Sequence, residues 1–464
     1  MSYGNRTASN TIDMCSGPIV SRLLLFAIPL MLSSVLQLLF NAADVIIVGK
    51  YAGDDSLAAV GMTVPLINLV IGVFMGLSIG SNVLASRYYG SGDDVRLSRT
   101  LHTSVLVSVI GGIVLAAVGF VLSTQILVWM RAPGETLQLG SLYLKIYFLG
   151  MPASMLYNFG SAVLRAVGDT RRPMYYLFTA GVINVILNLF FVISLHMDVA
   201  GVAAATVISQ IVSALLVVRC LMKETGPLHL SPASLTIDRT EFLMIFRIGI
   251  PAGLQGMLFS LSNVIIQSAV NGFGATVVAG NSAAQNIEGF IYVSMNAFYQ
   301  ACISFVSANV GARRPERINR IVIRAEICVF VTGLTLGGLA YLFGYRLLNI
   351  YTDSRAVMDA GIIRMRYVCL PYFLCGMMDV MVGGLRGLGY AILPMIVSFL
   401  GACGLRIIWI FTLFRLPRFH ETRYLYVTYP VTWIITVLAH VICYVIVKRR
   451  FDRKHFINSS QIPY

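Results

Sequence analysis

Long apolar stretches recur along the whole chain, and they limit its fold more than any other feature. Each holds about 20 or more residues, enough to cross a hydrocarbon core about 30 Å thick. Only 12% of the 464 residues are charged and 57% are hydrophobic, which argues against a water-soluble fold. The stretches are too long for barrel strands, and a backbone in lipid must satisfy its own hydrogen bonds, so they are helices. We predict an all-α membrane protein with twelve spans, over 18–46, 56–86, 98–125, 136–162, 173–195, 199–221, 242–270, 277–308, 320–345, 360–385, 391–414 and 425–447.

The basic residues predict how these spans cross the membrane. Most of the 34 Lys and Arg residues fall in the two tails and in the loops that follow even-numbered spans. By the positive-inside rule, both termini are then cytoplasmic. The net charge of +14 is explained by this bias and by attraction to anionic lipid, so we expect membrane lipid as a partner and no nucleic acid.

Neither the N-terminus nor the cysteines predict processing or metal binding. The first seventeen residues are polar and lack the short apolar core and small-residue cleavage site of a secretory signal. The eight cysteines lie mostly inside predicted helices, with no CxxC pair. We expect them to be reduced packing residues, and we expect no metal site beyond a transported Na⁺.

The chain contains an internal repeat. The Leu164–Gly168 segment matches Leu385–Gly389 at a shift of 221 residues, and the same shift relates Ala58 to Ala279 and Gly90 to Gly311. Six spans per copy place both copies in the same orientation, and transporters built from such parallel repeats bind substrate between them near the midplane. The predicted parts are a cytoplasmic tail 1–17, an N-lobe 18–221, a cytoplasmic linker 222–241, a C-lobe 242–447 and a cytoplasmic tail 448–464.

Polar side chains lie within the first predicted span. Gln37, Asn41 and Asp44 share one helix face, and an ionised Asp at mid-bilayer costs about 2.5 to 3.5 kcal/mol. We therefore expect Asp44 to face the interior, where it is paired, ion-bound or protonated. The alternative is that Asp44 anchors the helix end at the headgroups.

Later spans of the first half carry residues that could complete a site around Asp44. Asn184 and Asn188 lie one turn apart, and Thr206 follows in the next span. Their oxygens suit Na⁺ and equally a protonated carboxyl. The alternative is hydrogen bonding between helices, worth about 0.6 kcal/mol per contact.

The second half carries a longer polar stripe, which we assign to a substrate cavity. Glu288 is its most persuasive member because it sits well inside a long span. Methionines near Asp379 suit a promiscuous apolar surface, although such residues more often fill gaps in a core. Together with Gln37, the candidate cavity residues are Gln255, Asn263, Gln285, Glu288, Tyr292, Met378 and Asp379.

The sequence resembles the multidrug and toxic compound extrusion (MATE) transporters, of the bacterial DinF-like type, over essentially its whole length. The resemblance rests on the segments Asn41–Gly49, Leu57–Gly61, Gly76–Gly80, Tyr89–Asp93 and Val310–Ala312 and on the two Leu-Arg-x-x-Gly turns. It implies two six-helix bundles around a central cavity that exchange H⁺ or Na⁺ for organic compounds.

The resemblance also implies roles for particular residues. Asp44 matches the ion-coupling acid on the family's first helix, and Asn184, Asn188 and Thr206 resemble the positions that join it in some members. Asn188 stands where those members have a second acid, which favours H⁺ over Na⁺ here.

The expected function is therefore multidrug efflux by cation-coupled antiport, with alternating access between two lobes. We expect small organic substrates of cationic or amphipathic character, a monomer in the plasma membrane, no cofactor and no enzyme activity. A flippase for lipid-linked saccharides is the alternative, and it predicts a cavity rich in Arg and Lys. A channel or receptor is a third possibility, disfavoured by the repeat.

Overall fold

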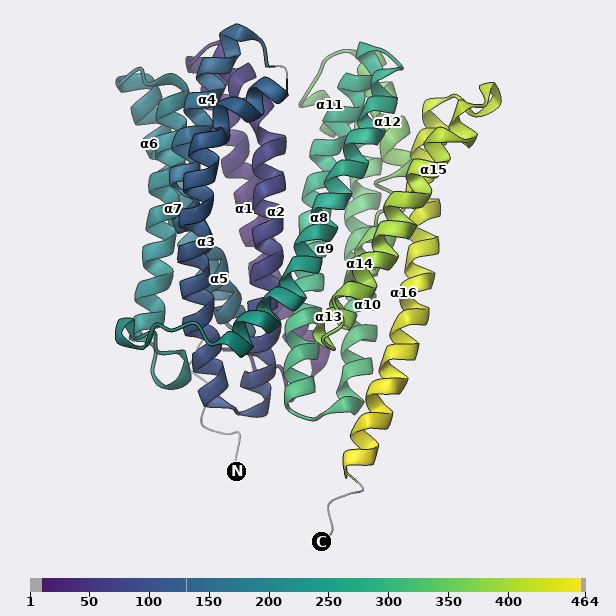
Figure 1. Ribbon diagram of the computed structural model, residues 1–464. Helices are drawn as coiled ribbons and strands as arrows, with labels where there is room; N and C mark the ends of the chain where they lie inside the picture. The colour runs from purple at the N-terminus through teal and green to yellow at the C-terminus, as the bar shows by residue number, and fades with distance from the viewer. Residues whose placement is uncertain (1–10, 131, 460–464) are drawn as a thin grey trace. The chain divides into compact units, whose positions relative to one another are not determined.

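The computed structural model describes residues 11–130 and 132–459. Among these residues every regular element is a helix, and ten helices are long and apolar enough to cross a membrane. The all-α fold predicted from the sequence is confirmed, and twelve spans are compatible with it. The chain is a multi-pass membrane protein. Contacts divide it into two compact units, shown in Figure 1, which are described separately below.

The first unit holds the described part of Met1–Asp13 together with Leu32–Gly253. Its last helix, α8, and its first, α1, also contribute residues to the second unit. The segment between α7 and α8 packs on α3, where the Ser231 amide donates to His102 Nε2 at 3.2 Å. The helices are α1 (Ile19–Tyr51), α2 (Asp54–Ser91), α3 (Asp94–Trp129), α4 (Gly134–Leu149), α5 (Met151–Ala166), α6 (Arg171–Leu189) with a π-helical turn η2 (Phe190–Ser194), α7 (Asp198–Lys223) and α8 (Arg239–Asn271).

The second unit holds Met14–Met31 and the described part of Leu254–Tyr464. The lobe limits predicted from the sequence stay a prediction. Its helices beyond α8 are α9 (Ala275–Gly311), α10 (Pro315–Leu342), α11 (Gly344–Asn349), α12 (Arg355–Tyr367), α13 (Phe373–Gly387), α14 (Ile392–Ser398) with a π-helical turn η5 (Phe399–Gly404), α15 (Leu405–Phe411) and α16 (Thr422–Ser459).

Two predicted spans are interrupted helices rather than continuous ones. The stretch predicted over 136–162 consists of α4 and α5, which meet at Gly150 just before Pro152. The stretch predicted over 360–385 is divided between α12 and α13, with Pro371 in the break. A proline lacks the backbone N–H that a helix needs, and its ring clashes with the preceding turn, so both breaks have a local cause.

The internal repeat appears in the helix boundaries. The starts of α2, α3, α4 and α6 correspond to those of α9, α10, α12 and α14 at the shift of 221 residues found in the sequence. Gly53 and Gly274, which precede α2 and α9, also share a left-handed φ, of 86° and 90°. The same helix design is therefore used twice.

Close helix packing in the first unit depends on two glycines of α2. A Cβ built on Gly76 would lie 2.1 Å from the Gly253 backbone nitrogen, and one on Gly80 would lie 2.3 Å from the Ile245 carbonyl oxygen. Small residues allow such backbone approach between helices in lipid. Gly72, four residues earlier, has open space instead.

One turn differs between the repeats in a way that predicts a stabilising substitution. Gly92 ends α2 with φ 71°, and its counterpart after α9 is Arg313, with φ 54°. An L-residue with a left-handed backbone is strained by about 1 to 2 kcal/mol, and glycine removes this strain. Glycine also raises the conformational entropy of the unfolded chain, which offsets part of the gain in stability. Arg313→Gly is therefore expected to stabilise the protein by about 0.5 to 1 kcal/mol, measured as a higher thermal unfolding midpoint in detergent.

A neighbouring substitution controls for this effect. Ala312 has a right-handed backbone (φ −70°, ψ 0°), so Ala312→Gly gains no relief from strain and should lower the midpoint. A lower midpoint for Arg313→Gly as well would show that the Arg313 side chain stabilises the turn more than its backbone strains it.

Candidate functional site

Four of the predicted ion-coupling residues come together in the first unit. Asn188 on α6 donates its amide hydrogen to the carboxylate of Asp44 on α1. The same amide nitrogen lies 3.3 Å from Asn184 Oδ1, and the Asn184 amide donates to Thr206 Oγ1 on α7 at 3.4 Å. Helix α1 and the consecutive helices α6 and α7 thus place one carboxylate, two amides and one hydroxyl in a single cluster, which we call the Asp44 cluster.

The Asp44 cluster contains a buried acceptor that is not used. Asn188 is fully buried, and among the described residues nothing donates to its Oδ1 atom. Both of its amide contacts are donated through the nitrogen, so its oxygen lies free beside a carboxylate. An unsatisfied buried acceptor costs about 1 to 3 kcal/mol, which a bound proton or cation would reduce. The cluster therefore offers oxygen groups that suit either a small hard cation or a protonated carboxyl.

The surroundings of the Asp44 cluster are apolar, which strengthens any charge interaction inside it. Ile47 and Val48 of α1 belong to a buried core that also contains Val202 of α7. Tyr143 and Tyr147 of α4 stack with ring centroids 6.1 Å apart, and both interact electrostatically with Asp44. Directly after Asn188 and Leu189, the helix changes to the π-helical turn η2, a feature found often at functional sites.

Two further candidates on the same helix lie outside the cluster. Asn41 and Gln37 are both exposed, whereas Asp44 is partly buried. No hydrogen bond joins either of them to the four clustered residues within the described part of the chain. The α1 face expected from their spacing is therefore partly buried at Asp44 and exposed at Asn41 and Gln37.

In the second unit, Glu288 belongs to a buried ion pair. Both of its carboxylate oxygens accept hydrogen bonds of 2.7 Å from Arg364 of α12. Arg364 also donates to Asn281 Oδ1 at 2.8 Å, and the Tyr426 hydroxyl donates to the same oxygen at 3.1 Å. Since Arg364 is 2% exposed and Glu288 is 5% exposed, this network ties α9, α12 and α16 together inside the unit. The carboxylate of Glu288 is committed to Arg364, so we do not include it among the proposed substrate contacts.

The other candidates of the second unit have different surroundings. Asp379 is partly buried and interacts electrostatically with Tyr292, which is 38% exposed. Gln285 and Asn263 are exposed. Met378, at 1% exposure, belongs to a core cluster and presents no open surface. The acid, the tyrosine and the two exposed amides are thus the candidates placed where a substrate could reach them.

Two more arginines, Arg386 and Arg406, are buried in the second unit. Arg386 donates to Gln255 Oε1 at 2.8 Å and to the Tyr299 hydroxyl. Arg406 donates to Thr432, and its guanidinium lies 4.2 Å from the centroid of the Tyr429 ring. Gln255, a cavity candidate, is therefore occupied by an internal hydrogen bond. Planar guanidinium groups suit both bidentate and stacked contacts, and here they hold helices together.

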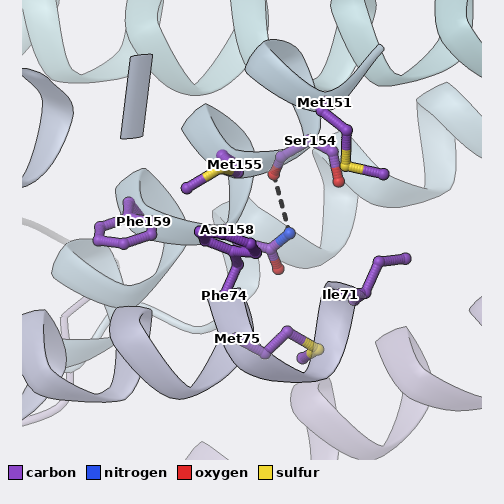
Figure 2. Close-up of a pocket in the computed structure, with 8 residues that line it drawn as sticks. All are labelled: Ile71, Phe74, Met75, Met151, Ser154, Met155, Asn158 and Phe159. Carbon is purple, nitrogen blue, oxygen red and sulfur yellow. Dashed lines mark hydrogen bonds between the residues drawn. The ribbon is translucent and has the colours of Figure 1, made fainter. Parts of the chain in front are cut away.

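A pocket opens in the first unit between α2 and α5. Figure 2 shows three methionines, Met75, Met151 and Met155, lining a small hollow that is partly open to solvent. The Asn158 amide is tied to the Ser154 carbonyl oxygen at 2.8 Å and supplies a polar group on one wall. Flexible thioethers can repack around ligands of different shape. The remaining lining residues are Ile71, Phe74 and Phe159.

Sequence reasoning missed Arg364, although a signal for it was present. Arg364 lies inside the span predicted over 360–385, and an ionisable residue at membrane depth needs a partner. Glu326 in the span predicted over 320–345 carries the same signal. The spacing could not identify either partner, because Arg364 and Glu288 are 76 residues apart.

Known proteins resemble this chain over nearly all its length. It is 27% identical to the "Probable multidrug resistance protein YoeA" of Bacillus subtilis (strain 168), covering 89% of this chain and 91% of the relative. It is 24% identical to the "Probable multidrug resistance protein NorM" of Thermotoga maritima, covering 82% of each. A solved structure described as the outward-facing conformation of a multidrug resistance MATE family transporter superposes with a TM-score of 0.90 at 21% identity, covering 97% of this chain and all of that one.

The family model MatE matches the chain twice, over residues 29–190 and 251–412. The two matches begin 222 residues apart, which agrees with the repeat found in the sequence and in the helix boundaries. They cover more than half of the chain. This chain therefore belongs to the MatE family of MATE transporters.

Proposed function

We propose that the protein exports small organic compounds of cationic or amphipathic character by antiport against a cation, with H⁺ favoured over Na⁺. Two lobes alternate access to the substrate, and the cation and the substrate favour different arrangements of them. A ligand shifts such an equilibrium only through its different affinity for the two states. The proposal places a monomer in the plasma membrane with both termini cytoplasmic, without a resident cofactor or catalytic activity.

The observation that carries this proposal is the hydrogen bond from Asn188 to the Asp44 carboxylate, together with the lack of any donor to Asn188 Oδ1 among residues 11–130 and 132–459. A charge at membrane depth must be paired, neutralised or bound to an ion, and Asp44 has only neutral partners in its cluster. The choice of H⁺ rests on the single carboxylate. Among residues 11–130 and 132–459, no three His, Cys, Asp or Glu side chains gather into a potential metal site.

The proposed substrate contacts combine apolar and acidic groups. In the first unit the methionine-rich pocket of Figure 2 offers an adaptable apolar surface. In the second unit Asp379 and Tyr292 could attract a cationic group, and Asn263 and Gln285 are further exposed polar candidates. The relatives, which are named as multidrug resistance and multidrug export proteins, support small organic compounds as substrates.

The flippase alternative gains little from the buried arginines. A lipid-linked saccharide would need cations free to bind its phosphates. Arg364 pairs with Glu288, Arg386 binds Gln255 and Tyr299, and Arg406 contacts Thr432 and Tyr429. Each of the three is held by partners within its own unit.

The proposal is tested by measuring cations released when substrate binds to the purified protein. Ethidium is added to protein in weakly buffered detergent containing a pH indicator, and parallel samples carry radioactive Na⁺. Proton release without Na⁺ release is the expected result. Na⁺ release alone would replace the coupling ion, and release of neither cation would overturn cation-coupled antiport.

A matched variant tests whether the loss of any acidic side chain changes proton release. Asp353 is an exposed acid in the loop before α12. Asp353→Asn removes the same charge as Asp44→Asn, and it should release protons as the native chain does.

A further inference from the structure

Glu326, an acid that the proposed mechanism does not use, lies on the inward face of α10. Val322 and Val329, one turn to either side of it, contact α13. A Cβ built on Gly384 would lie 3.1 Å from Val322 Cγ2, and one built on Gly376 would lie 2.7 Å from Val329 Cγ2. Residues at i, i+4 and i+7 share one helix face. The side chain of Glu326 therefore enters the interface with α13 within the second unit, and lipid does not surround it.

The carboxyl group of Glu326 has no polar partner in this interface. Both of its oxygens are buried, and neither takes part in a hydrogen bond with any described residue. The Cys302 thiol of α9, itself fully buried, is the one titratable group with an electrostatic interaction to it. Among the described residues, no Arg, Lys or His side chain interacts with Glu326.

The other titratable groups nearby are engaged elsewhere. On α9, Tyr299 accepts a hydrogen bond from Arg386 of α13, and Asp379 of α13 interacts with Arg386 and Tyr292. On α16, Tyr444 donates to Asn319 at 2.9 Å, and His440 lies beside Ser398 at 3.3 Å. On α10 itself, Cys328 interacts with Arg324. Within the described part of the chain, the carboxyl of Glu326 is therefore without a counter-charge.

An ionised carboxylate in such a place is expensive. Moving an unpaired carboxylate into a protein interior costs several kcal/mol even after relaxation, and groups in this position usually become neutral instead. A neutral carboxylic acid still has an unused donor, but that penalty is only about 1 to 3 kcal/mol. The geometry therefore favours the protonated form.

Packing does not explain why an acid occupies this position. The residue that corresponds to Glu326 at the 221-residue shift is Val105, which is 6% exposed in α3. The same helix interface of the first unit is thus filled by a valine. An acid at the equivalent site of the second unit adds chemistry that the shared scaffold does not require.

We propose that Glu326 is a proton-binding site of the second unit, separate from the Asp44 cluster, and that it holds a proton at neutral pH. On release, the O–H bond breaks, the electron pair stays on the carboxylate, and the proton passes to water. This inference does not rest on the proposed function, because a buried protonated acid can be detected without transport.

Infrared spectroscopy of the purified protein tests the proposal. The difference spectrum between the native chain and Glu326→Val should contain the carbonyl-stretching band of a protonated carboxylic acid at neutral pH. Labelling with ¹³C-glutamate should shift this band, which separates Glu326 from Asp44. The Asp44→Asn variant should retain this band. Valine is chosen to replace Glu326 because the first repeat already has Val105 at the equivalent position.

A proton titration supplies a second readout. On raising the pH from neutral to strongly alkaline, Glu326→Val should release about one proton per chain fewer than the native protein. Glu326→Gln, which keeps the shape of the side chain, replaces the valine variant if that one fails to fold. A difference spectrum showing a carboxylate band at neutral pH would overturn the proposal, since Glu326 would then be ionised.

Discussion

Asp44→Asn is expected to reduce substrate export at least about tenfold while leaving a folded, membrane-inserted protein, because coupling between two ligands is usually worth about 5- to 150-fold. Asn has the shape of Asp and can still hydrogen-bond to Asn188, but it cannot bind a proton or carry a charge. The measurement is ethidium efflux from proteoliposomes driven by a pH gradient.

Two controls separate coupling from folding. The thermal unfolding midpoint of Asp44→Asn should stay close to that of the native chain, because the substituted residue is only partly buried. Asp353→Asn should export at the native rate. Efflux by Asp44→Asn at the native rate would remove Asp44 from the mechanism, whatever the outcome for Glu326.

Breaking the buried pair between Arg364 and Glu288 is expected to have the largest effect on stability. Arg364→Met leaves Glu288 without its bidentate partner, and removal of one member of a buried pair costs about 3 to 5 kcal/mol. Combining it with Glu288→Met removes both charges and should recover most of that loss. The free energy of unfolding in mixed detergent micelles provides the measurement.

The same helix offers a matched control for this loss. Arg355, at the start of α12, pairs with Asp359 at 3.3 Å, and both side chains are more than half exposed. Exposed pairs contribute less than about 1 kcal/mol, so Arg355→Met should cost far less than Arg364→Met. Equal losses for the two variants would contradict the role assigned to the buried network.

The positions of the helices could largely be predicted from the sequence. Hydrophobic length is a local property, and lipid leaves helices as the form for such segments, so twelve spans could be counted. The repeat between Leu164–Gly168 and Leu385–Gly389 gave the shift that the helix starts follow. The breaks at Pro152 and Pro371 were missed, although both prolines are visible, because hydropathy does not distinguish one interrupted span from a continuous one.

The Asp44 cluster was predicted in part. Asp44, Asn184, Asn188 and Thr206 were named from their spacing and from the family resemblance, and the structure brings these four together. Asn41 shares the α1 face of Asp44 by periodicity and is nevertheless exposed. Helical periodicity predicts which residues share a face, but it does not predict which part of that face the neighbouring helices cover.

The sequence alone predicts a polytopic helical membrane protein, its twofold internal repeat and Asp44 as a candidate acid inside the first span. These follow from hydropathy, periodicity and charge, which act over a few helical turns. Packing between helices, in contrast, sets three features that no local pattern shows. Arg364 pairs with Glu288, Asn188 donates to Asp44, and none of the described residues hydrogen-bonds to the carboxyl of Glu326. The physical reason is that a side chain's partner depends on the rotation and depth of each helix against the others, and packing between distant segments sets both.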